Sequence, residues 1–321
     1  MKYLVTGGAG FIGSHLVEQL LREKNWVTIV DGDMDKVTVI DDFSTGKFSN
    51  LPKNKRLKIV EASILSDIGN FFEGIDVVFH LAALTKPAWS LTHIGETNHV
   101  NVDGTVKILE HCRDHKIKRL VFVSSSAIYG EQKKYPTSED AIPNPMNPYA
   151  LTKLIGEQYC KLFEVMYGLE SNYIRPFNAY GTRQDPVGPY GAAVPKFIDR
   201  VNSIIHDVRT GEVPFITGDG EQARDFIHVD DVVDIMIRAS KSRVSGKAFN
   251  AGSGRNISIN ELYDKVTTIM GEKVKPFYAE AIFEPRQTLA DMTQVKKILG
   301  WKQKIGLEEG LRRTVEETLN K

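Results

Sequence analysis

Residues 3–13 read YLVTGGAGFIG, and this stretch decides the fold. A short apolar run at residues 2–6 ends in a glycine-rich turn, and apolar residues then recur at positions 12, 16, 17, 20 and 21, which is helical spacing. Gly7 permits a tight turn, Gly10 lets the backbone approach a pyrophosphate, and Gly13 lets the helix pack closely on the sheet. The helix N-terminus then offers free N–H groups and a partial positive charge to a phosphate. The stretch predicts a dinucleotide-binding loop.

Strand-like and helix-like segments alternate after this loop. Apolar runs that suit buried strands lie at 57–60, 76–80, 120–124 and 172–176, and helical stretches lie between them near 97–115 and 149–167. Repeated strand–helix–strand order predicts an α/β fold, a doubly wound parallel sheet of the Rossmann type with helices on both faces. Strands buried on both sides explain unbroken apolar runs such as VVFHLAA and LVFVSS.

The pattern changes after Pro176. The next residues, 177–193, are rich in Gly, Pro, Tyr and Asn and indicate a functional loop. A capping box, Ser258 to Glu261, begins a predicted helix that stops at Gly271. Further elements are expected at 194–208 and 230–241 (helices) and 248–250 (a strand that rejoins the sheet). We expect a dinucleotide-binding domain of residues 1–176, rejoined by about 229–252, and a smaller substrate-binding domain of residues 177–228 and 253–321.

Composition excludes some partners. The chain has 321 residues, with 41 Lys plus Arg and 41 Asp plus Glu, so no net charge attracts nucleic acid or an acidic membrane. No apolar run reaches the roughly 20 residues that span a bilayer, and no signal peptide precedes the first strand. Cys112 and Cys160 form no CxxC pair and are expected to be buried, reduced thiols. We expect a cytoplasmic protein without nucleic-acid, membrane or metal partners.

An acidic residue at the end of the second strand would bind the adenosine ribose and repel a ribose phosphate, which favours NAD over NADP. Residues 26–42 contain two strand-like segments in tandem, each ending in aspartate, so about ten residues look inserted. Asp31 has the better spacing from the glycines, whereas Asp41, in VIDDFSTG, has the better local context. We favour Asp41.

Tyr149 and Lys153 lie four residues apart at the start of a helix and share one face. A nearby ammonium favours the phenolate, so the tyrosine can exchange a proton with a substrate hydroxyl while hydride moves to or from nicotinamide. YxxxK alone is more often a surface pair. Here Ser124, Ser125 and Ser126 follow the strand at 120–123, and ligands of such sheets bind at the carboxyl ends of the strands. With these serines nearby, the Tyr149–Lys153 pair is interpreted as catalytic.

Five motifs, in order, carry a family resemblance: GGAGFIG (7–13), HLAA (80–83), SSSAIYG (124–130), YALTK (149–153) and GDGEQARDFIHVDD (218–231). Together they resemble the extended short-chain dehydrogenase/reductases, specifically the NAD-dependent nucleotide-sugar epimerase/dehydratase family, over nearly the whole chain. The resemblance implies NAD as cofactor, a nucleotide-sugar as substrate, and Ser125, Tyr149 and Lys153 as catalytic residues, with Ser126 beside the sugar. It also implies a homodimer formed through the helices near 97–115 and 149–167.

The resemblance further implies which residues surround the cofactor. They are Gly7, Gly10, Phe11, Ile12 and Gly13 at the pyrophosphate, Asp41, Asp42 and Gly46 near the ribose, Ser63 and Ile64 near the adenine, Leu81, Ala82, Ala83, Thr85 and Asn101 along the cofactor, and Tyr149, Lys153 and Phe177 near the nicotinamide. One position departs from the family, which usually has an aspartate where Ser63 stands. The adenine contact is therefore weaker or made by another group.

On the substrate side, the resemblance implies that Arg224 and Arg286 grip the diphosphate or nucleoside ribose and that Asn178 donates to a phosphate. The planar guanidinium suits phosphate oxygens. Phe215 packs either on the base or in the core, and Lys86 contacts either the sugar or solvent. Leu289 lies near the second carbon of the sugar in this resemblance and limits the size of its substituent.

Neighbours of the serines separate the reactions within the family. Sugar dehydratases carry Asp then Glu where this chain has Ser126 and Ala127, and xylose-forming decarboxylases carry a glutamate at the position of Ala127. The segment EPRQTLAD does resemble the corresponding segment of the decarboxylases, so UDP-glucuronate decarboxylation stays an alternative function. So do another nucleotide-sugar oxidoreductase and a non-catalytic NAD-sensing regulator. The best interpretation is a UDP-sugar 4-epimerase for glucose/galactose or their N-acetylated or uronic forms.

Overall fold

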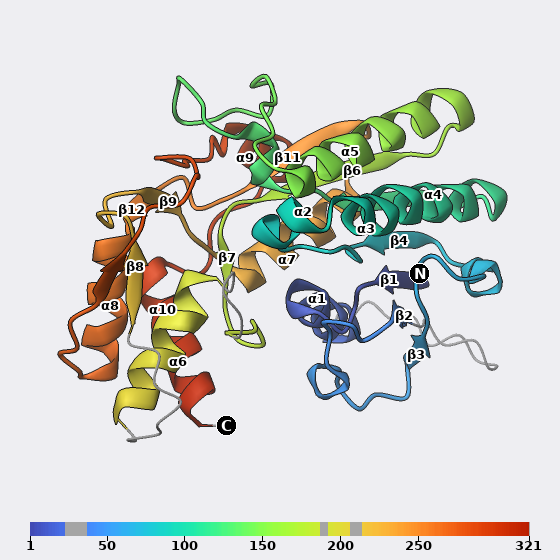
Figure 1. Cartoon of the computed structure of the whole chain (residues 1–321). Helices are drawn as coiled ribbons and strands as arrows, with labels where there is room; N and C mark the ends of the chain where they lie inside the picture. Colours follow the sequence, from blue (N-terminus) through green and yellow to red (C-terminus); the bar gives the residue numbers. More distant parts are fainter. Residues whose placement is uncertain (23–36, 187–191, 206–213, 321) are drawn as a thin grey trace.

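The computed structural model describes residues 1–22, 37–186, 192–205 and 214–320 of the chain (Figure 1). Its centre is a seven-stranded sheet in the order β11-β6-β5-β4-β1-β2-β3, in which every neighbouring pair is parallel. The strands are β1 (Tyr3–Thr6), β2 (Val37–Asp41), β3 (Leu57–Glu61), β4 (Val77–His80), β5 (Arg119–Val123), β6 (Ser171–Pro176) and β11 (Lys247–Ala251). The strand order reverses between β1 and β4, and ligands of doubly wound sheets bind at this point. The predicted fold class is confirmed.

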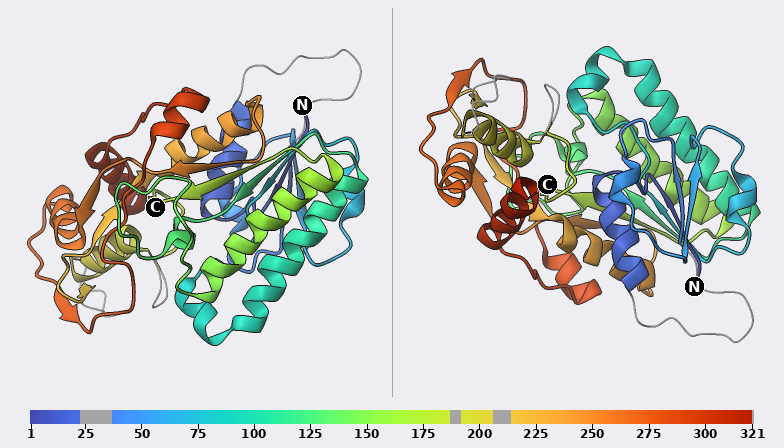
Figure 2. Two further views of the ribbon diagram at one scale, coloured as in Figure 1. Left: turned by 90° about the horizontal axis from the view of Figure 1, so that it is seen from above. Right: turned by 90° about the horizontal axis from the view of Figure 1, so that it is seen from below.

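Helices cover both faces of the sheet (Figure 2). One apolar cluster holds α1 (Phe11–Arg22), α7 (Val229–Lys241) and α9 (Thr293–Leu299) against the sheet. The opposite cluster holds α4 (Gly104–Asp114) and α5 (Pro148–Tyr167), and it includes Cys112 and Cys160 as buried free thiols, as expected. The alternating burial of strand side chains between these two clusters is why the strands read as unbroken apolar runs.

The helix predicted near 97–115 is interrupted in the structure. It consists of α3 (Ile94–Asn98), one π-helical turn η3 (His99–Asp103) and then α4. The Thr105 hydroxyl donates to the Asn101 carbonyl at 2.6 Å in this region. Such π-bulges are frequent at functional sites because they redirect side chains, and Asn101 lies in this one. Just before α3, α2 (Pro87–Thr92) packs on α5.

Helix α5 begins where its sequence predicts. Asn147 caps it by accepting a hydrogen bond from the Ala150 N–H at 2.9 Å, Pro148 occupies the first turn, and Gly168 ends it in the left-handed conformation. This start places Tyr149 and Lys153 in the first two turns, at the carboxyl ends of the neighbouring strands.

The remaining elements surround a third apolar cluster on the side of the molecule that holds the C-terminus (Figures 1 and 2). They are α6 (Ala193–Ile205), β8 (Phe215–Thr217), β9 (Ala223–Asp225), β12 (Asn256–Ser258), α8 (Ile259–Met270), β13 (Phe277–Ala279) and α10 (Leu307–Leu319). The pairs β8–β13 and β9–β12 form two small sheets, and β7 (Ala179–Tyr180) pairs with β10 (Ile227–His228). Short 3-10 helices complete the fold: η1 (Phe48–Asn50), η2 (Gly69–Phe72) and η4 (Ser126–Tyr129).

Two predictions for this half are confirmed, and one boundary differs. The strand expected at 248–250 is β11, which rejoins the sheet beside β6, and the Ser258 hydroxyl caps α8 by accepting the Glu261 N–H at 3.1 Å. However, α9 and Trp301 belong to the first cluster with α7, although they follow residue 253. The chain therefore returns to the large sheet once more than the sequence pattern indicates.

Candidate active site

The glycine loop joins β1 to α1 with little spare space. Gly7 has a φ of +70°, which side chains rarely adopt, and its N–H donates to the Ile40 carbonyl at 2.8 Å. A Cβ on Gly13 would lie 2.1 Å from the Gly7 carbonyl oxygen, so α1 packs directly on the turn. Phe11 and Ile12 are then the first residues of α1, where the free N–H groups are. This cradle fits the pyrophosphate of a dinucleotide.

Asp41 is the last residue of β2 and lies beside the loop. Its buried carboxylate accepts hydrogen bonds from the Ala9 N–H and the Phe43 N–H, each at 2.9 Å, while burial raises its pKa. A Cβ on Gly46 would lie 2.9 Å from a carboxylate oxygen of Asp41, so that segment closes over the same acid. Asp42 is exposed, and its carboxylate accepts from the Ser44 N–H and hydroxyl. The alternative, Asp31, lies outside the described residues.

At the expected adenine end, the Ser63 side chain is already engaged within the chain. The Ser63 hydroxyl accepts a hydrogen bond from the Leu65 N–H at 3.2 Å, which closes its own turn. Ile64 is buried, and its side chain fills the space beside Gly104. A hydroxyl held this way cannot replace a carboxylate as a strong acceptor.

The segment after β4 forms the next wall. A Cβ on Gly7 would lie 2.7 Å from the Ala82 nitrogen, so this segment touches the glycine loop. Asn101 fixes the wall, because its side chain accepts from the Leu84 N–H at 2.7 Å and donates to the Leu84 carbonyl and the Thr152 hydroxyl, both at 3.0 Å. The other predicted residues of this wall are Leu81 and Ala83, which are half-buried, and Thr85 and Lys86, which are exposed.

The three catalytic candidates meet at the end of β5. The Ser125 hydroxyl caps η4 by accepting the Ala127 N–H at 3.1 Å and also hydrogen-bonds to the Tyr149 phenol. One turn along α5, the Lys153 ammonium donates to the Val123 carbonyl at 2.8 Å. Ser126 follows Ser125 and is half-buried. The structure therefore brings together a hydroxyl, a phenol and an ammonium at the carboxyl end of β5, next to β4, whose following segment touches the glycine loop.

Burial sets the charge states of these groups. Burial raises the pKa of Tyr149, and its hydrogen bond with Ser125 acts in the opposite direction. Burial lowers the pKa of Lys153 to about 8. Behind them, His80 bridges the Thr6 and Thr105 hydroxyls at 2.7 and 3.0 Å, and burial lowers its pKa to about 3, so it is neutral. Perturbed groups gathered at strand ends are typical of active sites.

The two predicted phosphate-binding arginines lie on adjacent segments. Arg224 of β9 is buried and forms an ion pair with Glu284 at 2.9 Å. Arg286 is exposed and forms a bidentate pair with Asp219 at 2.8 and 2.9 Å. The Ala223 N–H donates to the Arg286 carbonyl at 3.0 Å, which joins the two segments. Both guanidinium groups therefore have carboxylate partners that a diphosphate would have to displace.

The other predicted substrate residues differ in what they contact. The Asn178 amide donates to the Asp225 carbonyl at 3.0 Å. Phe215 lies under the Arg200 guanidinium, 4.1 Å from the ring centroid, so one ring face is already covered. Leu289 is half-buried, and its carbonyl accepts from the Thr137 N–H at 2.7 Å. Phe177 is buried, with its N–H bonded to the Ala251 carbonyl at 2.8 Å.

One buried ion pair beside the catalytic candidates is not predicted from the sequence. Glu157 and Arg175 are both buried and form a bidentate ion pair at 2.9 and 2.7 Å. The sequence signal was the spacing of four residues from Tyr149 to Lys153, which continues to Glu157 on the same helix face.

Across residues 1–22, 37–186, 192–205 and 214–320, no group of three or more His, Cys, Asp or Glu side chains is placed to hold a metal ion. Among those same residues, no helix has both the length and the apolarity needed to span a bilayer.

Comparison with known proteins extends these observations. The sequence profile described as "NAD dependent epimerase/dehydratase family" matches residues 3–252. The UDP-glucose 4-epimerase of Mycolicibacterium smegmatis is 35% identical over 329 aligned positions that cover 100% of this chain and 99% of that protein. The UDP-N-acetylglucosamine 4-epimerase from Methanobrevibacter ruminantium, solved with UDP-N-acetylmuramic acid, is 34% identical with a TM-score of 0.90, covering 99% and 98% of the two chains. The UDP-glucose 4-epimerase from Thermotoga maritima, solved with UDP-glucose, is 36% identical with a TM-score of 0.89, covering 100% and 99%.

Proposed function

Because the chain belongs to the NAD dependent epimerase/dehydratase family, we propose that it is an NAD-dependent 4-epimerase of UDP-sugars. One observation carries the proposal: Ser125, Tyr149 and Lys153 gather at the carboxyl end of β5, one strand away from the glycine loop of β1. The related 4-epimerases that span the whole chain support the choice of reaction. Glucose, N-acetylglucosamine and their uronic forms are the candidate sugars.

The residues of the chain divide the proton chemistry among them. The Tyr149 oxygen accepts the proton of the sugar 4-hydroxyl and later returns it, while Ser125 holds the reacting oxygen by hydrogen bonding. Lys153 stabilises the phenolate through its positive charge. When bound, NAD would supply the reversible hydride acceptor that oxidation and reduction at carbon 4 require. Gly7, Gly13 and the start of α1 would hold its pyrophosphate.

The neighbouring side chains disfavour the other reactions. Elimination of water needs an acid–base pair, and this chain has Ser126 and Ala127 at those positions. A decarboxylase needs a glutamate where Ala127 stands, on η4 beside Ser125. A non-catalytic regulator has no need of an assembled Ser–Tyr–Lys group. A ketoreductase would release its cofactor in each cycle, so NAD that survives purification argues for the epimerase.

The substrate diphosphate is assigned to the arginine side of the site. Arg224 and Arg286 would exchange Glu284 and Asp219 for phosphate oxygens, with Asn178 and Ser126 as further contacts. The apolar clusters support a division into a cofactor domain and a nucleotide-sugar domain. The first comprises residues 1–176, 229–252 and 293–301, and the second comprises 177–228 and the rest of the C-terminal third.

Incubation with a panel of UDP-, dTDP- and GDP-sugars, with product stereochemistry read by NMR, tests the proposal. Inversion at carbon 4 of a UDP-sugar, without net change in NAD, is the expected result. Loss of carbon dioxide from a uronic sugar would establish the decarboxylase instead. No change in any sugar, with NAD bound, would favour the regulator.

The assembly is proposed to be a homodimer through α4 and α5, which lie side by side on one face (Figure 2). The support is a set of exposed apolar side chains on α5, namely Leu151, Leu162, Val165, Met166 and Tyr167. Leu109 of α4 is fully buried against the sheet and cannot take part. Light scattering should give a dimer mass, and Val165→Glu should give a monomer. Ile142→Glu, an equally exposed position on a loop, is the matched control and should leave the dimer intact.

A further inference from the structure

Three acid–base side chains lie in a row on the buried face of α5. Tyr149, Lys153 and Glu157 are spaced four residues apart, and each is at least nine-tenths buried. Residues at this spacing are neighbours on a helix. The first two belong to the proposed reaction, and the third follows one helical turn beyond the lysine.

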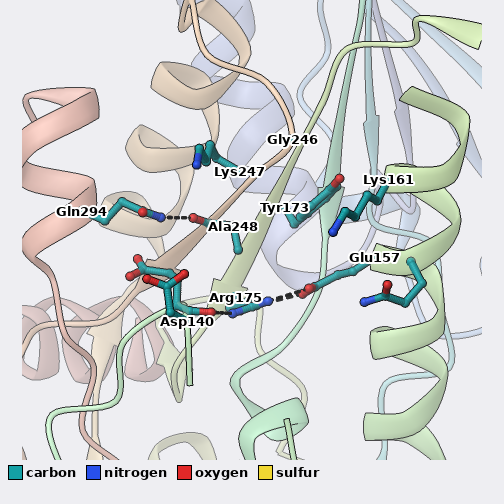
Figure 3. Close-up of a pocket in the computed structure, with 11 residues that line it drawn as sticks. Asp140, Glu157, Lys161, Tyr173, Arg175, Gly246, Lys247, Ala248 and Gln294 are labelled. Atoms are coloured by element: carbon teal, nitrogen blue, oxygen red, sulfur yellow. Dashed lines mark hydrogen bonds and ion pairs between the residues drawn. The ribbon is translucent and has the colours of Figure 1, made fainter. Parts of the chain in front are cut away.

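Glu157 is held by a second buried charge. The Arg175 guanidinium, on β6, donates from Nε at 2.9 Å and from Nη2 at 2.7 Å to the two carboxylate oxygens (Figure 3). Its third nitrogen, Nη1, donates to the Tyr129 hydroxyl and the Glu139 carbonyl, each at 2.8 Å. The carboxylate is therefore fixed in place, because a bidentate pair leaves it one orientation.

The same guanidinium reaches the loop that carries the catalytic serine. Tyr129 ends η4, which begins directly after Ser125, and the Tyr129 hydroxyl donates to the Asn250 side chain at 2.7 Å. Asn250 in turn donates to the Thr137 carbonyl at 2.9 Å. One buried network thus joins the catalytic helix, the serine loop and the segment beside Leu289.

The charges around Lys153 explain why a fixed carboxylate matters. Lys153 lies one helical turn from Tyr149, and Cys160 and Glu157 of the same helix and His80 of β4 interact with it electrostatically. His80 is neutral, and burial raises the pKa of the Cys160 thiol well above its usual value, so that the thiol is also uncharged near pH 8. Glu157 is the carboxylate that opposes the effect of burial on the Lys153 pKa.

The pKa values of Lys153 and Tyr149 show why a carboxylate beside the lysine is needed. Burial lowers the pKa of Lys153 to about 8 and raises that of Tyr149 above its ordinary value, so the lysine tends to lose its proton first. A neutral lysine gives no help to a phenolate. Any group that keeps the lysine charged therefore extends the pH range in which the tyrosine works.

We propose that Glu157, fixed by Arg175, is a positioning residue that keeps the Lys153 ammonium charged during proton transfer at Tyr149. This inference deepens the proposed function and rests on it for the identity of the reaction. The outer side of the ion pair lines a cavity of about 240 Å³ together with Glu139, Asp140, Lys161 and Lys247 (Figure 3). The test therefore alters the pair itself and leaves the rest of the cavity lining unchanged.

The first test is the pH profile of kcat for Glu157→Gln holoenzyme. Activity is lost as pH rises through the pKa of Lys153, and the variant should lose it about one pH unit lower, with KM for the sugar unchanged. At a pH one unit above the wild-type midpoint, kcat should be about tenfold below wild type. Glu170→Gln removes the carboxylate partner of buried Arg119 at the amino ends of β5 and β6, away from Tyr149 and Lys153. It is the matched control, and its pH profile is expected not to shift.

The second test separates charge from structure. The exchange Glu157→Arg with Arg175→Glu keeps an ion pair but places a cation beside Lys153. A purely structural pair would be restored by this exchange, whereas the proposal predicts that the alkaline limb stays at low pH. If the exchanged protein does not fold, the Glu157→Gln profile decides alone. The inference would be overturned if the alkaline limb of the kcat profile of Glu157→Gln lay at the wild-type pH. It would also be overturned if the exchanged protein had a wild-type profile.

A spectroscopic readout is independent of turnover. Ionisation of Tyr149 is followed by phenolate absorbance as the difference between each protein and its own Tyr149→Phe partner. The phenolate should form at higher pH in Glu157→Gln than in the parent, and equal midpoints would contradict the proposal. If the parent protein epimerises none of the sugars, the proposed function fails, while this titration still decides the role of Glu157.

Discussion

Replacing Gly13 with alanine tests whether the glycine loop is the cofactor cradle. The added Cβ would lie 2.1 Å from the Gly7 carbonyl oxygen and 2.9 Å from the Gly8 Cα, and both are backbone atoms. To relieve this overlap α1 must move away by roughly 1 Å, and overpacking of this kind costs about 1–3 kcal/mol. For a protein of this size the melting temperature should fall by about 2–10 °C.

The same movement withdraws the first N–H groups of α1 from the pyrophosphate. Losing one hydrogen bond to a charged group raises the Kd for NAD by about ten- to hundredfold. Calorimetry on protein stripped of cofactor measures the Kd, and the melting temperature is recorded without NAD. Gly95→Ala is the control, since a Cβ there meets nothing within 4 Å, and its Kd should equal that of the parent. A Gly13→Ala protein with unchanged NAD affinity would show that the cofactor binds elsewhere.

Four further substitutions test the site. Tyr149→Phe should lower kcat at least about a hundredfold while NAD stays bound, because only the phenol oxygen is lost; near-normal epimerisation would exclude the tyrosine as the proton acceptor. Asp41→Ala should weaken NAD binding more than Asp31→Ala, and titration of both variants would reveal the reverse order if Asp31 binds the ribose. Leu289→Ser should shift the ratio of kcat/KM values toward UDP-N-acetylglucosamine over UDP-glucose by roughly ten- to two-hundredfold, since one steric contact is worth about 1–3 kcal/mol; an unchanged ratio would place the size limit on another wall.

Much of the fold could be predicted because its signals are local. The strand before Gly7, the amphipathic helix after it and the capping box at Ser258 each lie within a few residues, and each is found where the sequence places it. The choice between Asp31 and Asp41 was different, because two tandem segments have the same pattern. Within the described residues, Val37–Asp41 lies between β1 and β3 and brings Asp41 to the Ala9 N–H, so Asp41 stays the proposed ribose ligand until the two alanine variants are compared.

The return of α9 to the large sheet could not be read from the sequence. An amphipathic helix of seven residues carries no information about which apolar cluster it joins, and Val295 and Leu299 suit either one. The interruption of the helix near residue 101 was hidden for a related reason. A π-helical turn keeps the surrounding apolar spacing almost intact, so periodicity alone reads through it.

The catalytic group itself shows where sequence reasoning reaches its limit. Tyr149 and Lys153 were found because their relation is a spacing of four residues on one helix. The groups that fix Glu157 and the serine loop in place come from farther along the chain: Arg175 is 18 residues from Glu157, and Asn250 is 121 residues from Tyr129. Such partners meet only after the sheet has brought β6 and β11 beside β5. A motif therefore identifies the candidate reacting atoms, whereas the buried charges proposed to set their pH range lie outside the motif.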